Sequence, residues 1–176
     1  MSHKADVKRF NELFVPHMNA AYNLARWLTG NDNAAHDVVQ ESALRAFRFM
    51  DRFAGGNARA WLLAIVRNQS YTWLKQSGNN RWINIGDEIA EDDIALSHTE
   101  TPESHSIRSQ DTALLHKALQ ELPPQFREVI ILKELEEMAY KDIAIVADIP
   151  LGTVMSRLAR ARGMLKTELV KLYAHE

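Results

Sequence analysis

A helical segment near the carboxyl end carries side chains suited to nucleic acid. Residues 151–169 repeat an apolar residue every three or four positions, which gives a helix one packing stripe. The opposite side of this segment carries Thr153, Ser156, Arg157 and Arg160. Helix-turn-helix proteins place such a side in the major groove of DNA, where hydroxyl and guanidinium groups reach base edges and phosphates. We therefore expect this helix to bind duplex DNA.

The residues just before this helix predict the rest of the same motif. Residues 140–148 have the pattern of a short amphipathic helix, and a turn follows at residues 149–153. We expect Gly152 to relieve crowding near the turn and Thr153 to lie in the first helical turn, where its hydroxyl and the backbone amides meet phosphate. The alternative, an arginine-rich surface that only faces solvent, is disfavoured by the turn.

Aromatic and basic residues alternate in a second segment, residues 52–82. Single-stranded nucleic acid is bound by such pairings, since aromatic rings stack on bases and cations follow phosphates. The alternating residues are Phe53, Trp61, Tyr71, Trp73 and Trp82 with Arg52, Arg59, Arg67, Lys75 and Arg81. The alternative for Trp61 and Trp73 is a role as core anchors. The residues that share a helical face away from the apolar positions are Asn68, Tyr71, Thr72 and Lys75.

A third surface combines acidic and amide groups around one leucine. Asp37, Gln40, Glu41, Leu44 and Arg48 are spaced so that they lie on one side of a helix. Two interpretations remain open here: a solvated face with a stray leucine, which is common in soluble helices, or a contact with another protein.

Residue patterns for catalysis and metal binding are missing from the sequence. It contains no cysteine, no glycine-rich phosphate loop and no nucleophile motif, and its seven histidines are scattered. We therefore predict that the protein is not an enzyme and needs neither a metal nor a cofactor.

Helical periodicity runs through most of the chain, and strand patterns are nearly absent. The first helix is expected at residues 7–29, bent near Pro16 and ended by Gly30. A second helix, capped by Asp32 or Asn33, should run to about Met50. A third helix is expected at residues 58–76. Helical periodicity resumes at about residue 107. Pro123 and Pro124 end that helix and start another, and the helix-turn-helix brings the last part to four helices.

These elements predict an all-α fold of two small helical domains. Residues 1–77 form one domain, residues 78–106 a flexible acidic linker, and residues 107–176 the other. Within the linker, the apolar residues Trp82, Ile83 and Ile85 could pack against another surface.

The distribution of charge along the chain is more consistent with binding to nucleic acid than the net charge is. The net charge is −2, but residues 1–82 hold 11 basic against 6 acidic residues and residues 83–112 hold 1 against 8. The chain shows neither a signal peptide nor an apolar run of the roughly 20 residues that span a bilayer. We therefore expect a cytoplasmic protein without membrane insertion.

Together, three stretches resemble regions 2 and 4 of extracytoplasmic-function (ECF, group IV) sigma factors of the sigma-70 family. They are DNAAHDVVQESALRAFRFMDRF, ARAWLLAIVRNQSYTWLK and LPPQFREVIILKELEEMAYKDIAIVADIPLGTVMSRLARAR. The resemblance implies a promoter-recognition subunit of bacterial RNA polymerase, with core polymerase, promoter DNA and an anti-sigma factor as partners. A free-standing helix-turn-helix regulator is the alternative.

The resemblance also implies roles for individual residues. The surface around Leu44 would bind the clamp helices of the β′ subunit, and region 4 would meet the β flap. The residues implied for the −10 element are Phe53, Arg59, Trp61, Arg67, Asn68, Tyr71, Thr72 and Lys75. Those implied for the −35 element are Thr153, Met155, Ser156, Arg157, Ala159, Arg160 and Arg162, with Arg157 and Arg162 more suited to packing or the DNA backbone.

Two positions depart from the family pattern. Met155 stands where many relatives have Arg or Lys, and Ala159 is small, so fewer side chains reach bases. We therefore expect the shape of the −35 duplex to contribute more to recognition.

Overall fold

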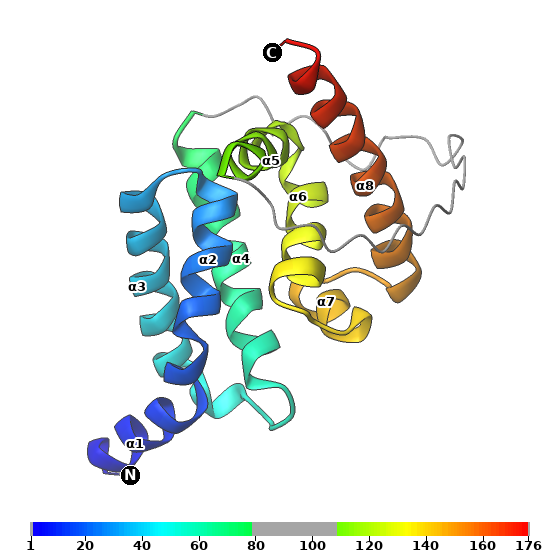
Figure 1. The fold of residues 1–176 in the computed structure, drawn as a ribbon. Helices are drawn as coiled ribbons and strands as arrows, with labels where there is room; N and C mark the ends of the chain where they lie inside the picture. The colour runs from blue at the N-terminus through cyan, green and yellow to red at the C-terminus, as the bar shows by residue number, and fades with distance from the viewer. Residues whose placement is uncertain (1, 79–108, 176) are drawn as a thin grey trace.

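A computed structural model describes residues 2–78 and 109–175, and all regular elements within these two ranges are helical (Figure 1). The predicted all-α fold class is confirmed. Most of the predicted linker, including Arg81, Trp82, Ile83 and Ile85, lies outside the described residues.

The first predicted helix is divided into two at Pro16. Helix α1 spans His3–Leu13, a short 3-10 turn spans Val15–His17, and α2 spans Met18–Thr29. Proline fits the first turn of a helix but breaks the interior hydrogen-bond pattern, so the chain changes direction there. Gly30 ends α2 with a φ of 70°, a left-handed conformation that glycine adopts without strain.

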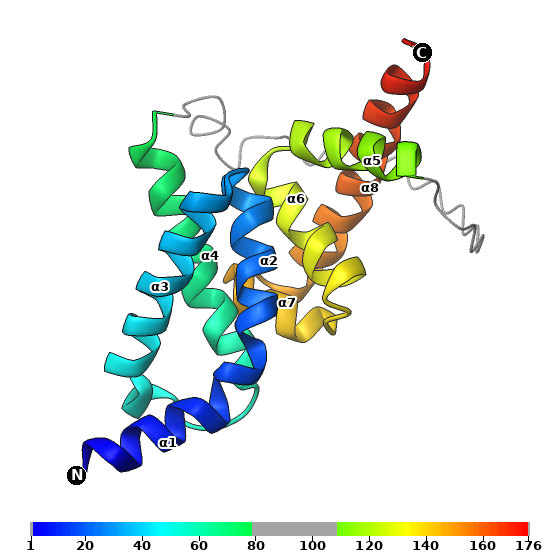
Figure 2. The ribbon, with the colours of Figure 1, turned by 60° about the vertical axis from the view of Figure 1, so that its left-hand side comes forward.

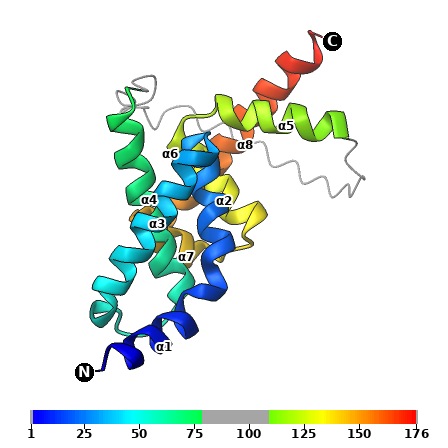
Figure 3. The same ribbon diagram turned by 90° about the vertical axis from the view of Figure 1, so that its left-hand side faces the viewer.

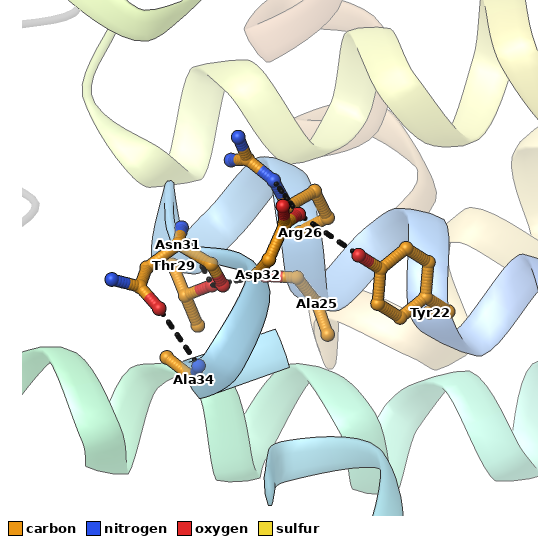
Figure 4. Close-up of polar contacts among 7 residues, drawn as sticks. All are labelled: Tyr22, Ala25, Arg26, Thr29, Asn31, Asp32 and Ala34. Atoms are coloured by element: carbon orange, nitrogen blue, oxygen red, sulfur yellow. Dashed lines mark hydrogen bonds and ion pairs between the residues drawn. The ribbon is translucent and has the colours of Figure 1, made fainter. Parts of the chain in front are cut away.

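Helix α3, Asp32–Arg48, starts one residue earlier than the sequence suggested (Figure 4). Its cap is Asn31, whose side-chain oxygen accepts a hydrogen bond from the Ala34 amide at 2.9 Å, so the predicted cap at Asp32 or Asn33 is wrong. The Asp32 carboxylate instead accepts hydrogen bonds from Tyr22 Oη at 2.9 Å and Arg26 Nε at 2.6 Å. These contacts lower the pKa of Asp32, the hydrogen bond from Tyr22 being the largest single cause, and they tie α3 to α2.

The amino-terminal unit is completed by α4, Ala58–Gln76, with the bounds predicted from the sequence. A 3-10 turn at Met50–Arg52 precedes it, and the Asn57 side chain caps it by accepting from the Ala60 amide at 3.1 Å. Helices α2, α3 and α4 pack against one another in pairs (Figure 3).

The carboxyl-terminal unit has four helices in the described chain, as predicted. Helix α5 spans Ser109–Glu121, α6 spans Pro124–Ile130 and continues into a π-helical turn at Ile131–Leu135, α7 spans Tyr140–Ala147, and α8 spans Leu151–Tyr173. Asp148 ends α7 at a φ of 53° and so makes the turn into α8. Aspartate tolerates this left-handed conformation better than most residues.

The two units share one hydrophobic core. Helix α2 lies against α6 (Figure 2), and α4 lies against α7 (Figure 1). Buried side chains from both units, including Leu24 and Leu63 on one side and Leu132 and Ile143 on the other, belong to a single cluster. The proposed domains therefore pack directly on each other in this structure.

The ends of the chain lie far apart, with α1 at one end of the molecule and the last turns of α8 projecting at the other (Figure 2). Across the part of the chain that is described, none of the helices has the length and apolar character required to traverse a membrane.

Candidate nucleic-acid interface

Helix α8 keeps the predicted DNA-binding side accessible. Its predicted packing stripe is buried at Val154, Leu158 and Ala161 and half-buried at Leu165 and Leu169, but Leu151 at the start of the helix is 47% exposed, so its expected burial is wrong. Met155 is 50% exposed and Ala159 is exposed, while Thr153 and Ser156 are half-buried. The accessible surface of α8 therefore follows the predicted pattern.

The three arginines of α8 differ in their surroundings. The Arg160 guanidinium lies over the Phe126 ring at 5.3 Å, and Arg162 Nη2 forms an exposed ion pair with Glu134 Oε1 at 2.9 Å. Arg157 is half-buried, and its charge favours the ionised form of the buried Glu128. Arg157 and Arg160 are thus both half-buried, and only Arg162 is fully at the surface.

Gly152 has a different environment from the one predicted. It lies within the first turn of α8, and a Cβ atom placed there would meet nothing within 4 Å. The expected relief of crowding is therefore wrong, because the left-handed residue Asp148 makes the turn instead.

Helix α4 exposes only part of its predicted DNA-binding face. Asn68, Thr72 and Lys75 are exposed, and Thr72 Oγ1 donates a hydrogen bond to the Asn68 carbonyl oxygen at 3.0 Å. Three other predicted residues, Arg59, Arg67 and Tyr71, are instead half-buried where α4 approaches the carboxyl-terminal unit.

Two of the basic residues of α4 bind the carboxyl-terminal unit. Arg59 Nη1 donates to the Glu136 carbonyl oxygen at 3.1 Å. Arg67 makes a two-pronged contact with Glu128, from Nε to Oε2 at 2.7 Å and from Nη2 to Oε1 at 3.1 Å. In this arrangement both side chains are engaged within the protein.

Phe53 and Trp61 belong to an aromatic cluster in the amino-terminal unit. The Trp61 ring stacks on Phe14 with centroids 5.2 Å apart, and Phe53 lies 5.5 Å from Trp61. Phe53 is only 8% exposed, and Trp61 is half-buried. Trp73 is also half-buried against the core, so the core-anchor alternative describes both tryptophans in this arrangement.

Burial shifts the pKa values of the groups where the units meet. Burial raises the pKa of Glu128, and Arg67 opposes this rise with hydrogen bonds and its positive charge. Burial also raises the pKa of Tyr71 well above its ordinary value, and the Glu128 charge adds to the effect. The Arg67 guanidinium lies 4.4 Å from the Tyr71 ring centroid. A buried ionic cluster thus joins α4 to α6.

The third predicted surface, on α3, is open throughout. Asp37, Gln40, Glu41, Leu44 and Arg48 are all exposed, and Leu44 is 65% exposed. Glu41 pairs with Arg45 Nε at 2.9 Å. At this exposure Leu44 contributes little to the packing of the chain, so its side chain is available for a contact with another protein. No cluster of three potential metal ligands occurs within residues 2–78 and 109–175.

Comparison with known proteins identifies the two units. A family model for sigma-70 region 2 matches residues 13–80, and one for sigma-70 region 4 matches residues 112–165. The ECF RNA polymerase sigma-E factor of Haemophilus influenzae is 35% identical over 96% of this chain and 92% of its own length. This chain belongs to the ECF sigma factors. It is an alternative sigma factor that directs transcription initiation.

Other relatives of this sigma factor agree. The RNA polymerase sigma-H factor of Pseudomonas aeruginosa is 32% identical over 96% of this chain and 90% of its own length. Among solved structures, the sigma factor RpoE from Bartonella quintana, in complex with the anti-sigma factor NepR, matches with a TM-score of 0.69 and 30% identity, covering 93% of this chain and 98% of that one. CnrH, in complex with the cytosolic domain of CnrY, matches in fold with a TM-score of 0.67, at 23% identity, over 93% of this chain and 89% of that one.

Two residues that join the units of this sigma factor were not expected from the sequence patterns. Arg127 and Glu128 are 3% and 0% exposed and both contact the amino-terminal unit. The available signal was a pair of adjacent opposite charges inside an apolar stretch, residues 126–132. Charged residues are seldom fully buried unless they are paired, so such a pair predicts internal partners.

Proposed function

We propose that three surfaces divide the work of this sigma factor. The α3 surface around Leu44 binds core RNA polymerase at the β′ clamp helices. The exposed face of α4 at Asn68, Thr72 and Lys75, joined by Arg59 and Arg67 once they are released, binds the −10 element. The outer face of α8 reads the −35 element, and the carboxyl-terminal unit also contacts the β flap. We further propose that residues 1–77 and 107–176 act as separate domains on the polymerase.

The exposure of Leu44 carries the polymerase assignment. Burying a leucine side chain contributes about 1.5–3 kcal/mol, so 65% exposure of Leu44 on an acidic and polar face leaves a binding contribution unused in the free chain. Basic grooves on a partner would complement Asp37 and Glu41, which flank it.

Cellular context and regulation follow from the same proposal. The protein acts in the cytoplasm with the polymerase, as a recognition subunit without catalytic chemistry of its own. An anti-sigma factor holds it inactive, as the complex of the Bartonella quintana relative with NepR suggests for a chain of this fold.

Reconstitution with core polymerase tests the assignment of α3. Leu44→Asp should reduce affinity for core polymerase at least about tenfold, which corresponds to about 1.4 kcal/mol. Val7→Asp is the matched control, since Val7 is also an exposed apolar residue, at 39%, but lies on α1. If the two variants bind core polymerase equally well, the α3 assignment is refuted. If the unmodified chain forms no active holoenzyme but binds duplex DNA tightly alone, the free-standing regulator is the better description.

A further inference from the structure

A buried carboxylate lies where the two units meet. Glu128 of α6 is 0% exposed, and the Arg67 side chain that reaches it from α4 is 17% exposed. Both guanidinium contacts to the carboxylate, at 2.7 and 3.1 Å, are within hydrogen-bonding distance. This two-pronged geometry is the one that arginine uses for carboxylates and for phosphates alike.

The face of the same guanidinium is also occupied. Tyr71 follows Arg67 by one helical turn, and its ring lies 4.4 Å from the guanidinium carbon. Because Glu128 occupies the Nε–Nη2 edge of Arg67 and the Tyr71 ring covers one of its faces, much of the surface with which arginine binds phosphates and bases is already in use. Closing the two units therefore withdraws Arg67 from the α4 surface.

An arginine of α8 also influences Glu128. The charge of Arg157 in α8 favours the ionised form of Glu128 and so lowers its pKa, against the larger effect of burial. One carboxylate thus interacts with arginines from both helices to which DNA binding is assigned.

Other contacts close to this pair also join the two units. Arg127 Nη1 donates to the Trp27 carbonyl oxygen at 2.8 Å, and the Trp27 ring stacks on His116 with centroids 4.5 Å apart. These contacts involve α2, α5 and α6, whereas Glu128 meets α4. The Glu128 pair thereby couples closure of the units to a charged side chain of the −10 surface.

We propose that Glu128 is an internal substitute for a DNA phosphate, binding Arg67 while the units are closed and yielding it to promoter DNA when the units separate. This inference rests on the assignment of α4 to the −10 element. A buried carboxylate without its partner is strongly unfavourable, so the pair opposes separation of the units until another anion can take Arg67. Glu128 thus controls whether Arg67 is available to the −10 element.

Distance measurements between the units test the proposal without DNA or polymerase. The chain has no native cysteine, so Glu12→Cys and Thr167→Cys, at exposed positions on α1 and α8, carry two spin labels. The chain with native Glu128 should give a single distance population. Glu128→Gln keeps the shape but removes the charge, and it should add a population at longer distance.

A second measurement follows the released arginine. Glu128→Gln should raise the affinity of the free chain for a mixed-sequence single-stranded DNA about tenfold. Glu134→Gln is the matched control, because Glu134 pairs with Arg162 inside the carboxyl-terminal unit at the surface, and the change in net charge is the same. It should leave the label distance unchanged and raise the DNA affinity less. Equal label distances and equal DNA affinities for the two variants would overturn the proposal.

A third variant covers the case in which Glu128→Gln does not fold. Arg67→Gln removes the other half of the pair from the more exposed side and should also lengthen the label distance, whereas an unchanged distance would refute the role of Glu128. The distance measurements use no DNA. They can therefore refute this inference while the assignment of α3, α4 and α8 to polymerase and promoter DNA remains valid. Conversely, if the distances lengthen but the DNA affinity of Glu128→Gln does not rise, the proposal that Glu128 takes the place of a DNA phosphate is wrong.

Discussion

Arg127 of α6 donates a hydrogen bond from Nη1 to the carbonyl oxygen of Trp27 in α2, 2.8 Å away, across the boundary between the two units. The same guanidinium also donates from Nε to the Leu119 carbonyl oxygen at 2.9 Å and from Nη2 to that of Leu122 at 2.8 Å. This one buried side chain thus donates to carbonyl groups near the carboxyl ends of α2 and α5 and joins the two units.

We expect Arg127→Met to destabilise the fold by about 3 kcal/mol or more. The substitution leaves buried carbonyl groups without donors, and each such group costs about 1–3 kcal/mol. Urea unfolding followed by circular dichroism measures the change. Arg162→Met is the control, since its exposed ion pair should contribute less than about 1 kcal/mol. Similar losses in both variants would show that Arg127 is not a structural centre.

Replacing the cap of α3 should also reduce stability. Asn31→Ala removes the acceptor for the Ala34 amide and should cost about 1 kcal/mol of unfolding free energy. Asn33→Ala, an exposed position in the first turn, should stay within about 0.5 kcal/mol. A larger loss at Asn33 than at Asn31 would contradict the observed start of the helix.

The pKa of His17 reports on the position of Arg59. Burial, and then the positive charge of Arg59, lower this pKa below its ordinary value of 6.5. The neutral imidazole is favoured in the folded chain, so the stability it contributes is present above pH 6.5 and declines as the pH falls towards the lowered value. Arg59→Gln should therefore raise the His17 pKa towards 6.5 in an NMR titration. Arg52→Gln should leave it unchanged, and an equal rise in both variants would refute the local effect of Arg59.

Recognition of the −35 element should depend on Arg160. Arg160→Ala should weaken holoenzyme binding to a −35 duplex by about 1–3 kcal/mol while affinity for core polymerase stays the same. Lys171→Ala, which breaks an exposed pair with Glu168 further along α8, is the control. A competition binding assay at fixed salt compares them. If Arg160→Ala leaves duplex affinity intact, base reading has been assigned to the wrong part of α8.

Local patterns were enough to predict most of the elements. The bounds of α4, the left-handed stop at Gly30 and the buried stripe of α8 were all predicted from periodicity and from residues with special backbone conformations. The cap of α3 was missed by one position, because Asn31, Asp32 and Asn33 are all good caps and only the packing of Tyr22 and Arg26 decides that Asp32 is used elsewhere.

The sequence by itself determined the fold class, the exposed face of α3 and the outer face of α8, because helical spacing fixes which side chains share a side of a helix. Only the tertiary structure decided that the two units close on each other and that Arg67 meets Glu128. That contact joins residues 61 positions apart on different helices, and no local pattern encodes such a pairing. Its physical basis is that a buried charge requires a partner, and folding determines which one lies within reach.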